Sequence, residues 1–486
     1  MKLTELLKKI SDLNSELKYD FDVNGLAYDS RKVNQNYIFF AIKGYKDDGN
    51  KFVNSAISNG AKLIVTSEKS EEQNGINYIY TENVRRLMAQ FSCAFYDYPS
   101  EKLNLIGITG TNGKTTTSYL IKSIIEENNF KSGLIGTIDY ISSDNKQESS
   151  LTTPESIELN KMLSEMVNSG FEYCVMEVSS VSLVLDRVFG LNFKSAVFTN
   201  LTPEHLDFHK TMDEYFKAKK ILFDNLSENS FAVSNSDDQY GKNIISDTKA
   251  KKIFYGINNK SDYTATDLKI NTKGISFNTT LSNKEFNFKT GITGRFNIYN
   301  TLAAVSVCYE LGFKPETIQS ALEKFNFVNG RFNIIHLKNG ADAIIDYSHT
   351  SDSLKNAIEA AIDLINERGE KGRVITVFGC GGNKDKTKRP VMGDIATQLS
   401  DYVIITSDNP RFEKPEEIIN EIIEGIDEKN NYEIEVNREL AIKRGIEISE
   451  SGDLLLICGK GHETYQEING VKNHFDDKEI VHKYNL

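Results

Sequence analysis

The stretch Leu103-Asn-Leu-Ile-Gly-Ile-Thr-Gly110-Thr-Asn-Gly113-Lys-Thr115-Thr-Thr117 decides the fold. Its apolar half, Leu103 to Thr109, predicts a buried strand, and the spacing after it predicts a helix over Thr115 to Glu127. Glycines between the two let backbone N–H groups approach an oxyanion, and the helix N-terminus adds partial positive charge. The segment therefore predicts a phosphate-binding turn.

Lys114 and Thr115 give this turn its chemistry. We expect the Lys114 ammonium to reach the terminal phosphates of a nucleotide and the Thr115 hydroxyl to coordinate Mg2+. The loop is not an ordinary Walker A, because Ile108 stands five positions before Gly113, where that motif has glycine. A neutral strand-to-helix turn has no use for a Lys-Thr pair, which favours nucleotide binding. ATP is preferred to GTP, because no GTP-type base-reading motif is evident.

Strands alternate with helices over most of the chain around this turn. The alternation over 103–226 and again over 343–458 predicts βαβ units and mostly parallel sheets. Between about residues 252 and 289 the hydrophobic period shortens to two, which indicates an antiparallel insertion or edge. We expect an α/β protein with a central P-loop-type sheet, an N-terminal α/β domain and a C-terminal doubly wound α/β domain, divided as 1–100, 101–330 and 331–486.

Composition bounds the class of protein. The 486 residues are 39% hydrophobic and 26% charged, enough for packed cores. The net charge of −12 argues against a general nucleic-acid binder but not against small anionic substrates. Five scattered cysteines with no CxxC pair are typical of a reduced, cytosolic protein with buried thiols.

The N-terminal segment, Met1 to Asp20, has leucines at helical spacing but no continuous apolar region or cleavage site. It predicts a helix rather than a signal peptide, and the sequence has no apolar run of the ~18 residues that span a bilayer. We expect a cytoplasmic protein with no membrane partner.

Farther along the chain, the segment from Gly133 to Tyr140 predicts one continuous strand.

His205 and His209, four apart, could indicate a zinc pair on a helix. The residues between them are Leu206-Asp207-Phe208, so the glutamate of HExxH is missing and a zinc hydrolase is disfavoured. His209 is expected to be an ordinary surface residue.

The phosphate-binding turn resembles the nucleotide loop of the Mur ligases, ATP-dependent enzymes that assemble the peptidoglycan stem peptide. Further motifs follow in that family's order: Asp29-Ser30-Arg31, Leu151-Thr152-Thr153-Pro154, Glu177-Val-Ser179-Ser180, Thr199-Asn-Leu-Thr-Pro-Glu-His205, Tyr215-Phe-Lys-Ala-Lys219, Gly294-Arg-Phe-Asn297-Ile-Tyr-Asn300, Asp346-Tyr-Ser-His349, Asp408-Asn409-Pro410-Arg411 and Gly459-Lys-Gly-His-Glu463. The set most resembles the member that adds the third amino acid. It implies a monomeric ligase that joins meso-diaminopimelate to the D-glutamate γ-carboxylate of UDP-N-acetylmuramoyl-L-Ala-D-Glu through an acyl phosphate, in cytoplasmic peptidoglycan precursor synthesis.

The resemblance also implies roles for single residues. ATP would be bound by Gly110, Thr111, Asn112, Gly113, Lys114, Thr115, Thr116, Asn297, Arg331 and Asp346. The residues that would act in catalysis are Lys114, Glu177, His205 and Lys219. Those that would bind Mg2+ are Thr115, Glu177, His205 and a carbamylated Lys219. The UDP-muropeptide would contact Ser30 in the N-terminal UDP-binding domain, and Thr152, Thr153, Ser179 and Arg187. Plainer alternatives are an arginine-paired Glu177, a helix-capping Asn297 and a solvated Lys219.

The amino acid would be held by Lys384, Asp408, Asn409, Pro410, Arg411, Gly459 and Glu463. Arg411 follows a predicted strand and offers a planar fork for the second carboxylate of diaminopimelate, while it repels the ammonium of lysine. Lys384 stands where the diaminopimelate-adding members have arginine. The alternatives are a sister ligase that adds lysine, a folylpolyglutamate-type ligase, and a P-loop switch without ligase chemistry.

Overall fold

Nine strands form the central sheet, in the order β13-β12-β11-β10-β5-β9-β6-β7-β8. The computed structural model describes residues 1–10, 17–44, 47–69, 71–143, 146–369, 371–427 and 431–485. Strands from β13 to β6 are parallel, and β7 and β8 add an antiparallel edge. The strands are β5 (Asn104–Thr109), β6 (Ser132–Ile135), β7 (Asp139–Ile141), β8 (Lys146–Glu148), β9 (Tyr173–Glu177), β10 (Ser195–Phe198), β11 (Phe231–Asn235), β12 (Lys251–Gly256) and β13 (Tyr263–Thr264).

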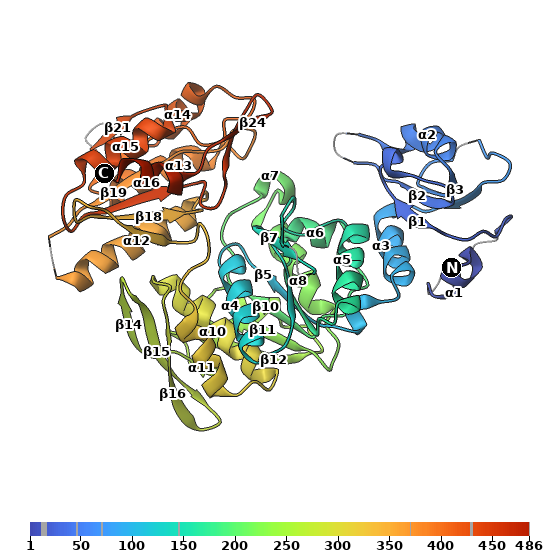
Figure 1. The fold of residues 1–486 in the computed structure, drawn as a ribbon, viewed down its shortest axis with the longest axis horizontal. Coiled ribbons are helices and arrows are strands. Elements are labelled where there is room, and N and C mark those ends of the chain that lie inside the picture. The colour runs from blue at the N-terminus through green and yellow to red at the C-terminus, as the bar shows by residue number, and fades with distance from the viewer. Residues whose placement is uncertain are drawn as a thin grey trace.

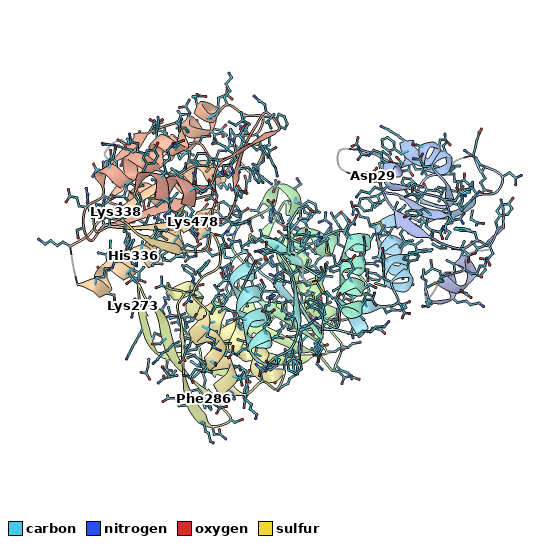
Figure 2. The ribbon with its side chains drawn as sticks, in the orientation of Figure 1. Asp29, Lys273, Phe286, His336, Lys338 and Lys478 are labelled. Atoms are coloured by element: carbon cyan, nitrogen blue, oxygen red, sulfur yellow. The ribbon has the colours of Figure 1, made fainter. Side chains whose placement is uncertain are left out.

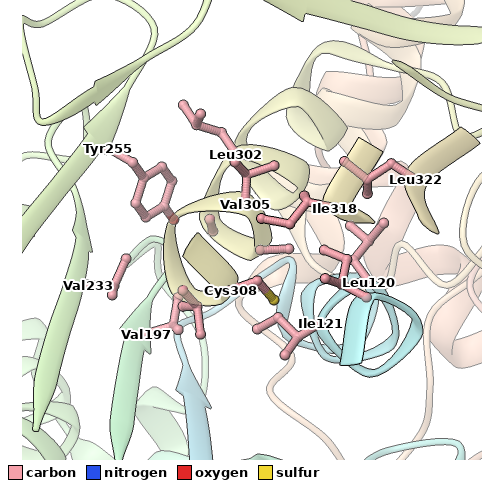
Figure 3. Packing of buried hydrophobic residues seen from close by; sticks show 14 of the residues in the cluster. Leu120, Ile121, Val197, Val233, Tyr255, Leu302, Val305, Cys308, Ile318 and Leu322 are labelled. Atoms are coloured by element: carbon pink, nitrogen blue, oxygen red, sulfur yellow. The ribbon is translucent and has the colours of Figure 1, made fainter. Parts of the chain in front are cut away.

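Helices cover both faces of this sheet. Figure 3 shows one face, where Leu120 and Ile121 of α4 and Leu302 and Val305 of α10 pack over Val197 of β10. All five of these side chains are buried, so the helix that begins at the phosphate turn is fixed to the sheet along its length. The helices are α4 (Lys114–Glu127), α5 (Ser156–Asn168), α6 (Ser180–Val184), α7 (Leu206–His209), α8 (Met212–Asp224), α9 (Gly241–Ile244), α10 (Arg295–Glu310) and α11 (Pro315–Lys324).

The region of period-two hydrophobicity contains a separate antiparallel sheet of β14 (Thr266–Asn271), β15 (Gly274–Leu281) and β16 (Lys284–Thr290). It lies beside α10 and α11, below the C-terminal part of the chain in Figure 1. Phe277 and Phe288 pair across β15 and β16 and are buried against the helices, which explains the alternation in the sequence.

The C-terminal part has a second doubly wound sheet, β17-β18-β22-β19-β20-β21, parallel except for β17. It lies above the central sheet in Figure 1. Its elements are β17 (Asn333–His336), β18 (Asp342–Asp346), α12 (Ser351–Arg368), β19 (Val374–Phe378), α13 (Lys388–Leu399), β20 (Tyr402–Ile405), α14 (Pro415–Ile423), β21 (Tyr432–Ile434), α15 (Arg438–Ile448), β22 (Leu454–Cys458), the hairpin β23 (Tyr465–Ile468) and β24 (Val471–His474), and α16 (Asp477–Tyr484).

The N-terminal part is a parallel four-stranded sheet, β1-β2-β3-β4. It stands apart from the C-terminal part, on the other side of the central sheet, and its helix α3 packs on α5. Its elements are α1 (Leu3–Lys8), β1 (Gly25–Ala27), β2 (Tyr37–Ala41), α2 (Val53–Ser58), β3 (Ala61–Thr66), β4 (Asn77–Tyr80) and α3 (Val84–Phe95).

Two sequence predictions differ from the structure. The helix expected within 1–20 is α1 alone, over Leu3–Lys8, and residues 11–16 lie outside the described part of the chain. The strand expected over 133–140 breaks at Gly136 into β6 and β7. A Cβ on Gly136 would lie 2.6 Å from Glu177 Oε1, so the break brings the backbone close to that carboxylate.

The five cysteines are buried and unpaired, as predicted. No helix within the described residues has both the length and the apolar character that crossing a membrane requires.

Candidate active site

The phosphate turn is shaped by two glycines with positive φ. Gly110 has φ 149° and Gly113 has φ 85°, the latter at the N-terminus of α4. A Cβ on Gly110 would lie 1.9 Å from Thr199 Oγ1, and one on Gly113 would lie 2.3 Å from Asn300 Oδ1. Backbone conformation and close approach both require glycine at these positions. The predicted strand–turn–helix is therefore present, with α4 pointing its N-terminus into the turn.

Lys114 folds back over this turn. Its Nζ donates to the carbonyl oxygens of Gly110 (3.0 Å) and Thr111 (2.7 Å). Thr115 Oγ1 accepts a hydrogen bond from Arg331 Nη2 at 3.0 Å. Two cations, the Lys114 ammonium and the Arg331 guanidinium, therefore lie at the turn. Arg331 belongs to the segment that precedes the C-terminal sheet.

Glu177 ends β9, next to β5, and is fully buried. Its carboxylate accepts hydrogen bonds from the Thr137 backbone N–H (2.9 Å) and from Thr137 Oγ1 (2.9 Å). The alternative of an arginine-paired glutamate is wrong, because both oxygens are bound to Thr137. The turn at Gly136 is what carries Thr137 to this position.

Lys219 is buried on α8, 1% exposed, and the alternative of a solvated lysine is wrong. Its Nζ donates to the Gly110 carbonyl oxygen (2.8 Å) and lies 4.6 Å from the centre of the Tyr215 ring. Burial and, next, the Lys114 ammonium hold the pKa of Lys219 well below its usual value. The Lys219 amine therefore lies directly against the phosphate turn.

Glu204 and His349 join the central and C-terminal parts at the rim of the turn. His349 Nε2 lies 3.3 Å from Glu204 Oε1, and His205 Nε2 lies 3.8 Å from Glu204 Oε2. Burial raises the pKa of Glu204, but the hydrogen bond from His349 and the two imidazole charges outweigh burial and hold it below its usual range. His205 is exposed at this rim, with a left-handed φ of 56°.

Asp346 ends β18, and its carboxylate is used within the C-terminal part. It accepts hydrogen bonds from the Phe332 N–H (2.8 Å), the Ser348 N–H (2.9 Å) and the Ser348 hydroxyl. Burial raises the pKa of Asp346. Arg331 stacks on Tyr347, 4.6 Å from the ring centre, so Asp346 holds the loop on which Arg331 rests.

The loop after β20 supplies the predicted amino-acid site. Asn409 Nδ2 donates to Glu463 Oε2 (2.7 Å), and Arg411 Nη1 donates to the Gly382 carbonyl oxygen (2.9 Å). A Cβ on Gly459 would lie 2.4 Å from Asp408 Oδ2, so glycine there lets the Asp408 carboxylate approach. Burial and then Asp408 raise the pKa of Glu463.

Lys384 lies across this loop. A Cβ on Gly381 would meet Arg411 Nη1 at 2.9 Å and Lys384 Cγ at 3.9 Å, so the two cationic side chains converge on one point. Burial and then the charge of Arg411 lower the pKa of Lys384.

A single cleft of about 760 Å³ runs from the phosphate turn to this loop. Most of the predicted site residues line it: Gly110, Thr111, Asn112, Gly113, Lys114, Thr115, Thr116, Thr152, Glu177, Ser179, His205, Lys219, Arg331, Asp346, Lys384, Asp408, Asn409, Arg411, Gly459 and Glu463. The cleft lining does not include Ser30, Thr153, Arg187, Asn297 or Pro410.

Asn297 lies inside α10 and caps nothing, because Gly294 holds the N-cap position. Its Nδ2 donates to the Thr293 carbonyl oxygen (2.7 Å) and its Oδ1 accepts from Asn300 Nδ2 (2.9 Å). Asn300 is therefore the amide at the cleft, oriented by Asn297.

Arg187 belongs to a network between the N-terminal and central parts. Glu155 accepts from Arg187 (2.9 Å) and from Arg85 of α3 (2.8 Å), and Arg187 Nη1 donates to the Thr153 carbonyl oxygen (3.0 Å). Ser30 lies farther out, beside Asp29, which Figure 2 labels on the far side of the molecule from His336. Arg187 thus lies at the junction of the two parts, and Ser30 lies in the N-terminal part.

The prediction for His209 is wrong: it is 6% exposed, not a surface residue. Its Nε2 pairs with Ser180 Oγ (2.8 Å) and its ring packs on Tyr215 at 5.0 Å. The amphipathic spacing of α8 could have indicated that Tyr215 needs a partner. Sequence reasoning also missed Thr137 and Asp352, neither of which stands in a distinctive pattern.

Three family profiles match the chain in order. The profile described as the Mur ligase family catalytic domain matches residues 22–96, the Mur ligase middle domain matches 108–308, and the Mur ligase glutamate ligase domain matches 330–461. The chain belongs to the Mur ligase family.

Relatives of this Mur ligase include the UDP-N-acetylmuramoyl-L-alanyl-D-glutamate–2,6-diaminopimelate ligase 1 of Clostridium acetobutylicum, 45% identical over 99% of both chains. The ligase so named in Clostridioides difficile is 41% identical, again over 99% of both chains. Among solved structures, a UDP-N-acetylmuramoyl-L-alanyl-D-glutamate–2,6-diaminopimelate ligase has a TM-score of 0.67 and 31% identity, covering 95% of this chain and 94% of that one.

Proposed function

We propose that this chain is the ATP-dependent ligase that joins meso-diaminopimelate to the γ-carboxylate of D-glutamate in UDP-N-acetylmuramoyl-L-Ala-D-Glu, a step in peptidoglycan precursor synthesis. The observation that carries the proposal is one cleft that is lined both by the phosphate turn and by two cations, Lys384 and Arg411. The names of the full-length relatives support both substrates. Family membership supports ATP as the nucleotide.

In the first step a substrate carboxylate oxygen attacks the γ-phosphorus of ATP. An O–P bond forms, the bond to ADP breaks, and an acyl phosphate results. Lys114, now bound to two carbonyl oxygens of its own turn, would turn to the transferred phosphoryl group, and Arg331 lies beside it on Thr115. Fixed cations of this kind stabilise the charge that develops in phosphoryl transfer.

The side chains proposed for Mg2+ offer a hydroxyl, a carboxylate and an imidazole: Thr115, Glu177 and His205. Oxygen donors of the first two kinds suit Mg2+, which usually keeps water and phosphate ligands as well. Within the described residues no three His, Cys, Asp or Glu side chains gather into a metal site. When bound, Mg2+ would neutralise charge on the phosphates. Thr137 meanwhile fixes the Glu177 carboxylate toward the turn.

Lys219 is proposed to carry a carbamate. Burial lowers the pKa of Lys219, which favours the amine form that adds to CO2, forming an N–C bond and releasing a proton. The product is a carboxylate in place of an ammonium beneath the turn. The carbamate would attract Mg2+, whereas the Lys219 ammonium would repel it.

In the second step the amine of the amino acid attacks the acyl phosphate. A C–N bond forms, phosphate leaves, and the nitrogen loses its proton. Arg411 and Lys384 are placed to hold a far carboxylate, and Asp408, Asn409 and Glu463 the amino-acid ammonium beside it. Gly459 and Pro410 shape the backbone of this pocket.

The UDP-muropeptide is proposed to extend from Thr152 and Ser179 in the cleft, past Thr153 and Arg187, to Ser30 on the N-terminal sheet. We also propose three domains, with boundaries at residues 100 and 330. The protein is proposed to be a monomer that acts in the cytoplasm, with no nucleic-acid or membrane partner.

The test is an ADP-release assay with UDP-muramoyl dipeptide and either diaminopimelate or lysine. The proposal expects release that depends on both dipeptide and diaminopimelate. ADP release with lysine but not with diaminopimelate would indicate a lysine-adding enzyme. ADP release that does not depend on any amino acid would indicate a P-loop switch. Removal of residues 1–100 should abolish activity here, whereas a folylpolyglutamate-type ligase should tolerate it.

A further inference from the structure

The β23–β24 hairpin lies against the loop that carries Arg411. Gln466 Nε2 donates to the Asp408 carbonyl oxygen (2.6 Å), and the Glu467 N–H donates to Asn409 Oδ1 (2.8 Å). The hairpin therefore binds two of the residues proposed to hold the amino acid, in addition to Arg411 itself.

The backbone of Arg411 is fixed on both sides by this hairpin. The Arg411 N–H donates to the Glu467 carbonyl oxygen (3.0 Å), and the Asn469 N–H donates to the Arg411 carbonyl oxygen (2.6 Å). Arg411 has a left-handed φ of 54°, a conformation that costs free energy for a residue with a Cβ. The two hydrogen bonds hold it there, and the side chain of Arg411 lines the cleft.

The Arg411 side chain is held as well. Its Nε lies 3.3 Å from Glu467 Oε2, and its Nη1 donates to the Gly382 carbonyl oxygen at 2.9 Å. Both side chains of the pair are 23% exposed, so solvent screens the pair only in part. Nη2 has no hydrogen-bond partner among the described residues. Two of the three guanidinium nitrogens are thus anchored, and Nη2 is left for a ligand.

The charges of the side chains around Arg411 and Lys384 also matter. Arg411 and Lys384 converge beside Gly381, and without an anion they would repel each other. Glu467 supplies one negative charge from outside the loop. Arg411, Lys384 and Glu467 together carry a formal charge of +1, which suits one further carboxylate.

We propose that Glu467 is a positioning residue that sets amino-acid selectivity: it holds the Arg411 guanidinium in the orientation that receives the far carboxylate of a dicarboxylic amino acid. This inference rests on the proposed function. It adds a residue outside every motif used to predict the site.

The test compares Glu467→Gln and Glu467→Ala with wild type in the ADP-release assay. Wild-type activity with diaminopimelate is measured first, since its absence would refute the proposed function and not this inference. We expect the KM for diaminopimelate to rise about threefold in Glu467→Gln and about tenfold in Glu467→Ala, with kcat and the KM for ATP unchanged. Asn473→Ala, at an exposed position of β24 in the same hairpin, is the matched control and should leave all three constants unchanged.

A double mutant separates positioning from general damage to the hairpin. If Glu467 acts through Arg411, then Glu467→Ala adds no further rise in KM to Arg411→Ala. An unchanged KM in both single variants, or an equal rise with and without Arg411, would overturn the inference. Glu467→Gln is isosteric, so it keeps the test available should the alanine variant fold poorly.

Discussion

Asp352, in the first turn of α12, accepts a hydrogen bond from the side-chain amide of Asn112 in the phosphate turn at 2.7 Å. The same Asp352 oxygen accepts from Thr202 Oγ1 at 3.2 Å. One carboxylate of the C-terminal part thus touches two loops of the central part. Together with the contact of Arg331 on Thr115, it joins the C-terminal part to the phosphate turn.

We expect Asp352→Ala to lower kcat about fivefold while the Kd for ATP stays nearly unchanged. The two lost hydrogen bonds join the C-terminal part to the central part and contribute about 0.5 kcal/mol each, whereas the phosphate turn itself belongs wholly to the central part. The ADP-release assay measures kcat, and calorimetry measures the Kd for ATP. Lys355→Ala, exposed on the same helix, is the control. A weakened ATP Kd with normal kcat would show that Asp352 binds nucleotide rather than closing the cleft.

Lys219→Ala should lose turnover by about a hundredfold or more, because the carbamate anion proposed beneath the phosphate turn would be replaced by a void. Short carboxylates such as formate or acetate should restore part of the rate by occupying that void. Lys217→Ala, 60% exposed and paired with Asp213, should be fully active. The carbamate itself is checked by a carbon-13 signal after incubation with labelled bicarbonate. A fully active Lys219→Ala enzyme would contradict any need for an anion there.

The sequence sufficed for features that are local. The phosphate turn was predictable because strand, glycines and helix are consecutive, and the Asp408–Arg411 loop because it directly follows a strand. Features made by distant packing were not predictable. Thr137 reaches Glu177 only because the chain turns at Gly136, a turn that a continuous apolar run conceals.

Charge partners show the same limit. Glu467 meets Arg411 across two segments with no motif that links them, so only the fold brings them together. His209 was expected to be an ordinary surface residue, yet the ring of Tyr215 and the Ser180 hydroxyl cover it.

His209 makes stability depend on pH. Burial, followed by the charges of His205 and Lys219, lowers its pKa from 6.5 to about 4. A histidine whose pKa falls on folding contributes stability that is complete above pH 6.5 and is lost as the pH falls toward 4. We expect His209→Gln to be less stable at neutral pH but to lose less of its free energy of unfolding between about pH 6.5 and pH 4.5. Urea denaturation across that range checks it, and parallel losses in both proteins would contradict the assignment.

Arg411→Ala should raise the KM for diaminopimelate about thirtyfold and leave ATP binding nearly unchanged, since the guanidinium lies at the end of the cleft away from the phosphate turn. Arg411→Lys should recover only part of the loss, because lysine keeps the charge without the planar fork. Lys414→Ala removes a cation of the same segment whose side chain is 78% exposed, and should have no effect. KM values for diaminopimelate, lysine and ATP, measured on all three variants, decide the matter. If the KM for diaminopimelate stays at the wild-type value in Arg411→Ala, the far carboxylate binds elsewhere, and Lys384 becomes the cation to replace next.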